Sequence, residues 1–180
     1  CIVDNVETLI SIYNAVKLGK PVMNRIFTVT GDAVKEPGNF NICIGMSYAE
    51  ILEAAGGFKT QPEKIISGGP MMGFAMFGLD IPTTKTSSSL LCLTKDDVAA
   101  SETTACINCG RCVEACPERI VPSKLAKMSE HGDMASFEKW NGMECIECGS
   151  CSFICPAKRP LAQSIKTMKK QILAERRNKK

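Results

Sequence analysis

Eight of the eleven cysteines in this chain fall into two short runs that have the same spacing. The first run is Cys106-Ile-Asn-Cys109-Gly-Arg-Cys112-Val-Glu-Ala-Cys116-Pro117, and the second is Cys145-Ile-Glu-Cys148-Gly-Ser-Cys151-Ser-Phe-Ile-Cys155-Pro156. Each follows the pattern C-x2-C-x2-C-x3-C-P, which is the thiolate spacing that holds a cubane [4Fe-4S] cluster. Two copies in tandem therefore predict two clusters.

The fourth cysteine of each run is expected to serve the other cluster. Three cysteines spaced two residues apart wrap a loop around three corners of the cube, and in two-cluster proteins the remote fourth ligand crosses over. The predicted ligands of cluster 1 are Cys106, Cys109, Cys112 and Cys155, and those of cluster 2 are Cys116, Cys145, Cys148 and Cys151. Gly110 and Gly149 lie between the second and third ligands, where a missing Cβ permits positive φ and close approach to the cluster.

Other roles for the cysteines fit the pattern less well. Zinc sites normally use cysteine pairs separated by a longer gap, and His131 is the only histidine. A disulfide framework suits small secreted chains with an even cysteine count, whereas this chain has eleven cysteines. Cys1, Cys43 and Cys92 lie outside the runs and are expected to be small buried hydrophobes. An apolar sheath is expected around the clusters, formed by Ile107, Val113, Ile120, Ile146, Phe153 and Ile154.

Length and composition set the broad class of the protein. With 180 residues, of which 44% are apolar, the chain has room for one ordinary domain or two small ones. It begins with Cys1, which suggests a piece of a longer protein, and no secretory signal opens it. The apolar central stretch from Met71 to Leu79 is far too short to cross a bilayer. We therefore expect a soluble or peripheral protein in a reducing cytoplasm, where free thiols persist.

The first part of the chain predicts a ββαβ unit. Asp4 and Glu7 form a helix-capping pattern, and Gly19 ends that helix. Strands are expected at 25–31 and 40–44, a capped helix over 47–55, and a third strand at 64–67. These elements together predict a small α+β domain.

The glycine-rich stretch 67–73 has two interpretations. It is expected to be a turn that packs its methionines and Phe74 on the core; a ligand-binding loop is the alternative, but the stretch matches neither phosphate-binding pattern. The residues expected to pack are Met71, Met72, Phe74 and Met76. The hydroxyl-rich residues 83–89 predict a linker, and residues 90–93 suggest one last strand.

The second part of the chain is expected to be mostly helical. Between the runs, 122–131 and 134–141 predict two short helices, with Phe137 and Trp140 packing this insert. A final helix from Pro160 places apolar residues on one face, namely Leu161, Ile165, Met168, Ile172 and Leu173. Its opposite face is basic, with Lys166, Lys169, Lys170 and Arg176. That face is expected to be solvated, or else to meet a membrane surface or an acidic partner, whereas nucleic acid is not an expected ligand.

Several segments together carry a resemblance to a known family. They are Asn5-Val-Glu-Thr-Leu9, Gly31-Asp-Ala-Val-Lys-Glu-Pro-Gly-Asn-Phe40, Gly68-Gly-Pro-Met-Met-Gly73 and Cys155-Pro-Ala-Lys-Arg-Pro-Leu161. The chain resembles the C-terminal half of the C subunit of the Rnf complex, the ion-translocating ferredoxin:NAD+ oxidoreductase. Members of that family have an FMN and NADH domain, a β-grasp module called SLBB and a two-cluster ferredoxin domain.

The resemblance implies the division of the chain. Residues 1–20 would be the end of the truncated FMN-binding domain, with Asn5, Glu7 and Thr8 near FMN. Residues 21–85 would form the SLBB-like β-grasp domain, 86–93 a linker, 94–160 the ferredoxin-type domain with two [4Fe-4S] clusters, and 161–180 a basic amphipathic helix.

The implied function is an electron relay between an upstream FMN and NAD(H) site and other Rnf subunits, peripheral to the membrane on its cytoplasmic face. A cobalamin reductase of the propanediol-utilisation type shares this layout and is one alternative. A metal-stabilised interaction module, in which the metal is structural, is another.

Overall fold

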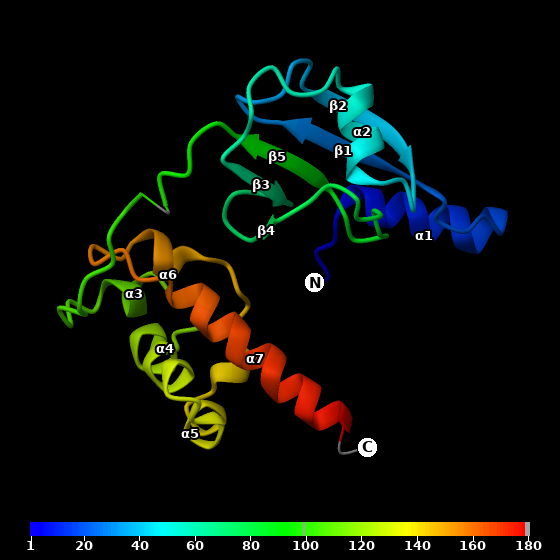
Figure 1. Ribbon diagram of the computed structural model, residues 1–180. Coiled ribbons are helices and arrows are strands. Elements are labelled where there is room, and N and C mark those ends of the chain that lie inside the picture. The colour runs from blue at the N-terminus through cyan, green and yellow to red at the C-terminus, as the bar shows by residue number, and fades with distance from the viewer. Residues whose placement is uncertain (99, 179–180) are drawn as a thin grey trace. The chain divides into compact units, whose positions relative to one another are not determined.

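The computed structural model describes residues 1–98 and 100–178, and the chain divides into two compact units, residues 1–96 and 97–180 (Figure 1). Residue 99 of the expected ferredoxin-type domain and the last two residues of the expected C-terminal helix lie outside the described residues. The first unit holds a mixed sheet with two helices, and the second is built from short helices and one long one. The α+β class expected from the sequence is confirmed.

The first unit is a five-stranded sheet in the order β2-β1-β5-β3-β4. Its strands are β1 (Asn24–Thr30), β2 (Gly38–Cys43), β3 (Lys64–Ser67), β4 (Phe74–Met76) and β5 (Ser89–Leu93). β1 and β2 form the expected antiparallel hairpin, with Phe27 opposite Phe40. β5 runs parallel to β1 and antiparallel to β3, so the central strand of the sheet is the last one in sequence.

Helix α2 (Tyr48–Ala54) closes the core of this unit. Ser47 and Glu50 form a complete capping box, as the sequence predicted. The ring of Tyr48 meets that of Phe27 edge to face, with ring centroids 5.7 Å apart. The buried Tyr48 hydroxyl lies 2.7 Å from Ser67 Oγ, so this polar group is satisfied inside the core.

Two predictions for the first unit need correction. The strand suggested at residues 90–93 is confirmed as β5 (Ser89–Leu93), in which Leu90 and Cys92 are fully buried. The linker implied for residues 86–93 therefore does not extend over this strand, whose partners lie far away in sequence. The prediction that the glycine-rich turn packs its side chains on the core is also largely wrong. Met71, Met72 and Phe74 are about half exposed, and of the four side chains named only Met76 is buried. Strand β4 pairs with β3 through its backbone, which leaves alternate side chains facing outward.

Helix α1 (Val6–Leu18) begins one residue later than predicted. Asn5, rather than Asp4, is the N-cap and accepts a hydrogen bond from the Glu7 backbone N–H at 2.8 Å. The Glu7 carboxylate does not reach back to the cap, because it pairs with Arg25 on β1 at 3.1 Å. Gly19 ends the helix in the left-handed conformation, as expected. Every residue of this helix is described, and none is buried.

The second unit packs its helices around the apolar stripe of α7 (Leu161–Asn178). The other elements are α3 (Arg111–Glu114), α4 (Pro122–Glu130), α5 (Met134–Lys139), the 3-10 turn η1 (Gly142–Glu144) and α6 (Ser150–Phe153). Leu161, Ile165, Met168 and Ile172 are buried, as the helical spacing predicted, whereas Leu173 is 40% exposed. The two helices predicted between the cysteine runs are confirmed as α4 and α5.

Of the two aromatic residues expected to pack the insert, Phe137 and Trp140, only Phe137 is buried. Phe137 is fully buried against the stripe of α7. Trp140 lies at the surface, 41% exposed, with the Lys124 ammonium 3.4 Å from its ring centroid. Its contact is therefore a cation–π interaction with α4 rather than packing in the core.

Three of the four basic residues expected on the outer face of α7 form ion pairs within the chain. Lys166 and Lys169 each lie 3.5 Å from the Glu147 carboxylate, and Arg176 lies 2.6 Å from Glu138. Among the residues that the structure describes, no helix combines the length and the apolar character needed to span a bilayer.

Candidate metal centres

The two cysteine runs adopt the same backbone conformation. We define loop 1 as residues 106–119 and loop 2 as residues 145–158. Residues with positive φ occupy the same three places in both, namely Asn108 and Glu147 (54° and 59°), Gly110 and Gly149 (78° and 81°), and Arg119 and Lys158 (54° and 52°). The sequence repeat is thus also a conformational repeat, and the positive φ predicted at both glycines is confirmed.

Each loop turns into a short helix that carries its third cysteine. Gly110 precedes α3, which contains Cys112, and Gly149 precedes α6, which contains Cys151. One capping residue, Ala115 or Ile154, separates each helix from the fourth cysteine. Ligands of two different clusters in the predicted scheme are therefore separated by one short helical turn.

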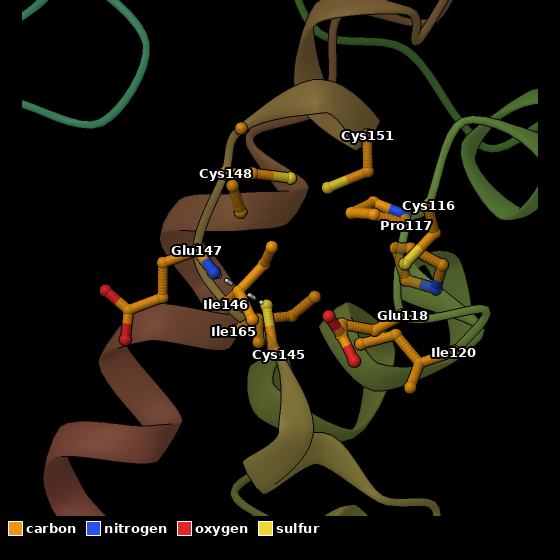
Figure 2. Close-up of a pocket in the computed structure, with 13 residues that line it drawn as sticks. Cys116, Pro117, Glu118, Ile120, Cys145, Ile146, Glu147, Cys148, Cys151 and Ile165 are labelled. Atoms are coloured by element: carbon orange, nitrogen blue, oxygen red, sulfur yellow. Dashed lines mark hydrogen bonds between the residues drawn. The ribbon is translucent and has the colours of Figure 1, made fainter. Parts of the chain in front are cut away.

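The eight cysteines are gathered into two pockets of four. The first pocket is lined by Cys106, Cys109, Cys112 and Cys155. The second is lined by Cys116, Cys145, Cys148 and Cys151, and their sulfur atoms are directed into one shared space (Figure 2). Each pocket combines three cysteines of one loop with the fourth cysteine of the other, which is the donor set that a crossed pair of cubanes requires.

The four thiols stand around each pocket instead of meeting at a point. Within residues 1–98 and 100–178, no three His, Cys, Asp or Glu side chains come close enough to hold a single metal ion. Each set of four thiols lines a pocket, which is the arrangement that a polynuclear cluster with four external thiolates fits.

The two pockets differ in the exposure of their cysteines. Cys106 and Cys109 of loop 1 are exposed, whereas Cys145 and Cys148 of loop 2 are partly buried. Burial raises the pKa of Cys145 and raises that of Cys151 to about 11. A hydrogen bond with the Ser150 side chain lowers the pKa of Cys148. Because metal binds thiolates, loading the second pocket must release protons from its buried thiols.

The residue in the third place of each loop contacts the first cysteine. The Glu147 backbone N–H donates to Cys145 Sγ at 3.4 Å. In loop 1 the Cys106 thiol donates to Asn108 Oδ1 at 3.7 Å. Hydrogen bonds to cluster sulfurs and ligands are a recognised influence on cluster potential.

The apolar sheath is only partly formed by the residues expected. Ile120 is buried and lines the second pocket, but Ile107 and Phe153 are 66% and 77% exposed. Ile107 nevertheless lines the first pocket, whereas Phe153 lines neither of the two cysteine pockets. Sequence analysis missed Leu161 and Ile165 as pocket walls, although their apolar spacing on α7 was visible.

The remaining cysteines split between core and surface. Cys92 is fully buried in the sheet, and burial raises its pKa to about 11. The expected buried position is therefore confirmed for Cys92. It is wrong for Cys1 and Cys43, which are exposed, and Cys43 sits on the outward side of edge strand β2.

The residues expected near FMN occupy the start of α1. The Asn5 side chain caps the helix, and Glu7 binds Arg25 as well as the Ile26 backbone N–H, at 3.2 Å. Thr8 is exposed. Asn5 and Glu7 thus have local structural roles in this unit.

Comparison with known proteins assigns a family to each of the two units. The family model described as SLBB domain matches residues 26–75, and the model described as 4Fe-4S dicluster domain matches residues 105–159.

Several curated relatives match nearly the whole chain. It is 47% identical over 169 residues to the C subunit of the proton-translocating ferredoxin:NAD(+) oxidoreductase complex of Clostridium ljungdahlii, covering 93% of this chain and 37% of that protein. It is 44% identical over 176 residues to the C subunit of the Na(+)-translocating complex of Acetobacterium woodii, covering 98% and 40%. Identity to the C subunit of the ion-translocating oxidoreductase complex of Methanosarcina acetivorans is 37% over 175 residues, covering 97% and 39%.

The chain thus spans about two fifths of the length of these relatives. The two family models follow the order of the two units, and the residues matched by the dicluster model include all eight cysteines of the two runs. Over the region that it spans, the chain belongs to the family of the C subunits of Rnf ion-translocating oxidoreductase complexes, with an SLBB domain followed by a 4Fe-4S dicluster domain.

Proposed function

We propose that this chain relays single electrons through two [4Fe-4S] clusters within an ion-translocating ferredoxin:NAD+ oxidoreductase. The observation that carries the proposal is the grouping of the eight cysteines, in which each pocket joins three thiols of one loop to the fourth thiol of the other. The two ligand sets are Cys106, Cys109, Cys112 and Cys155 for cluster 1 and Cys116, Cys145, Cys148 and Cys151 for cluster 2.

The crossed arrangement suits a relay because it keeps the two clusters close together. Cys112 on α3 and Cys116 just after it would serve different clusters. Only three residues separate Cys112 from Cys116, so the protein path between the two ligand positions is short. Bound clusters supply one-electron chemistry. The residues of loop 1 and loop 2 would hold the clusters and limit the access of water to them, and the relay requires no proton transfer.

The partners are proposed from the relatives. Their names describe the C subunit of complexes that couple ferredoxin and NAD+ to ion translocation. In the complete protein, FMN would convert two-electron nicotinamide chemistry into single electrons. Our proposal has Asn5, Glu7 and Thr8 near that flavin, other members of the complex as the electron partners, and the protein on the cytoplasmic face of the membrane.

The test is low-temperature EPR on anaerobically prepared, dithionite-reduced protein, together with iron and acid-labile sulfide assays. We expect two interacting S = 1/2 signals and about eight iron atoms per chain, the content of two cubes. The Cys109→Ala variant is expected to lose one cluster and keep the other, with about half of that iron.

Two outcomes would overturn the proposal. Full iron content in Cys109→Ala would remove Cys109 from the ligands. Zinc without sulfide in the anaerobic wild-type protein would favour the interaction module with a structural metal.

A further inference from the structure

Loop 2 is tied to α7 by charge at the place where loop 1 has a neutral residue. Glu147 lies 3.5 Å from both Lys166 and Lys169, whereas the equivalent residue of loop 1 is Asn108. Lys169 also donates from Nζ to the Cys145 backbone carbonyl. Its side chain is only 15% exposed, so its ammonium group is held beside a cysteine of the second pocket.

We propose that Lys169 is a positioning residue that raises the reduction potential of the cluster held in the second pocket. The inference rests on the proposed function, since it requires a cluster bound by Cys116, Cys145, Cys148 and Cys151. Lys169 acts through its positive charge, which its contact with the Cys145 carbonyl holds beside the pocket, and it does not itself bind the cluster.

The sign of the effect follows from charge. Reduction adds one electron to the cluster, and a nearby positive charge stabilises the more negative state. Because the ammonium is largely buried, salt screens it less than a surface charge. Net charge and hydrogen bonding near the sulfurs are the established influences on such potentials. Removing the positive charge of Lys169 should therefore lower the potential.

Glu147 has the opposite sign and gives the inference its sharpest test. Its carboxylate points away from the thiols in Figure 2, while its backbone N–H donates to Cys145 Sγ. Replacing the carboxylate by an amide keeps the backbone contact, and the Cys145 carbonyl still holds Lys169. Loss of one negative charge should therefore raise the potential. A purely structural clamp would predict that both substitutions loosen loop 2 in the same way.

Other charges surround the pockets and supply controls. Glu118 lines the second pocket, and Lys166 shares the Glu147 carboxylate. Arg159 lines the first pocket and lies 2.6 Å from Glu130. Lys170 is an exposed lysine next to Lys169 on the same helix. The Lys170→Met substitution therefore changes the same charge at a solvated place.

The experiment is an EPR-monitored redox titration of the whole chain with both clusters assembled, comparing Lys169→Met, Glu147→Gln and Lys170→Met. For Lys169→Met we expect one of the two midpoint potentials to fall by about 59 mV, which corresponds to a tenfold decrease in the equilibrium constant of a one-electron reduction. For Glu147→Gln the same midpoint should rise. Iron content, the second midpoint and both midpoints in Lys170→Met should stay at wild-type values.

Shifts of the same sign in Lys169→Met and Glu147→Gln would overturn the inference, as would unchanged midpoints or an equal shift in Lys170→Met. If Lys169→Met fails to assemble the cluster, Glu147→Gln alone decides, since a fall or no change contradicts the proposed sign. Absence of clusters in the wild-type protein would instead count against the proposed function, so the two failures are distinguishable.

Discussion

Loop 1 and loop 2 share one backbone but have different surroundings. Their positive-φ residues coincide at three places, and each glycine is followed by a four-residue helix. Loop 1 nevertheless exposes Cys106 and Cys109, while the matching cysteines of loop 2 are partly covered. The comparison shows that the ligand spacing dictates the backbone conformation of the loop. Elements more distant in sequence determine how exposed each pocket is to solvent and which charged residues lie near it.

Helix α7 is the main source of the difference. Leu161 lines the first pocket and Ile165 the second, so one apolar stripe supports both. Beyond this shared support, Lys166 and Lys169 bind only loop 2 among the ion pairs found in the described residues. Two loops with the same backbone thereby acquire different electrostatic environments, which would separate the potentials of the two proposed clusters.

The largest expected effect tests the crossed grouping directly. Cys116 belongs to the first run but lines the second pocket. We therefore expect Cys116→Ala to lose the same cluster as Cys148→Ala, leaving an EPR spectrum and midpoint identical to those of Cys148→Ala. Cys109→Ala is the matched comparison, because it should leave the other cluster. A Cys116→Ala spectrum that matches Cys109→Ala would mean that each run binds its own cluster.

The second prediction concerns the shared support. Ile165 is fully buried and Leu161 is 2% exposed. Truncating either to alanine should cost about 2–5 kcal/mol of unfolding free energy, because each leaves a cavity in the helical core. Anaerobic denaturant titration followed by circular dichroism measures the loss.

Leu173→Ala is the control on the same helix, since Leu173 is 40% exposed and should cost much less. An equal loss in all three variants would contradict the prediction, because burial would then not distinguish Leu161 and Ile165 from Leu173; helix propensity cannot explain a loss, since alanine is the better helix former.

The sequence predicted the local features of both units well. The cysteine spacing, the two glycines and the apolar stripe of α7 all depend on residues close together in the chain, and each predicted conformation is found. The helix boundaries at Ser47 and Gly19 were likewise set by local capping chemistry.

Features that depend on distant partners were not predictable in the same way. Strand β5 is central only because β1 and β3, which are distant from it in sequence, lie on either side of it. The ion pair between Glu147 and Lys169 joins a loop to a helix whose orientation no local pattern gives. The exposure of Ile107 and Phe153 likewise depends on which elements cover the loops.

A smaller effect is expected from the two glycines that start the helices. Gly110 and Gly149 have φ values of 78° and 81°, where a side chain adds about 1–2 kcal/mol of backbone strain. Gly110→Ala and Gly149→Ala should therefore destabilise the protein by similar amounts in thermal or denaturant unfolding. Gly78→Ala is the control, since Gly78 lies outside the left-handed region and faces open space. A loss in Gly149→Ala alone would show that the surroundings, not the shared backbone, set the cost.

The smallest expected effect concerns the position seven residues after the first cysteine, where the two loops carry different residues. Ser152 Oγ in loop 2 accepts a hydrogen bond from the Ala162 backbone N–H at 2.9 Å, in the first turn of α7, whereas loop 1 has Val113 there. Ser152→Ala should leave that helix-end donor without its acceptor and cost about 1 kcal/mol, measured by denaturant unfolding. Thr167→Ala, at an exposed hydroxyl of the same helix, should change stability by less than about 0.5 kcal/mol. Equal stability of Ser152→Ala and wild type would mean that water replaces the serine, so that this difference between the loops carries no energy.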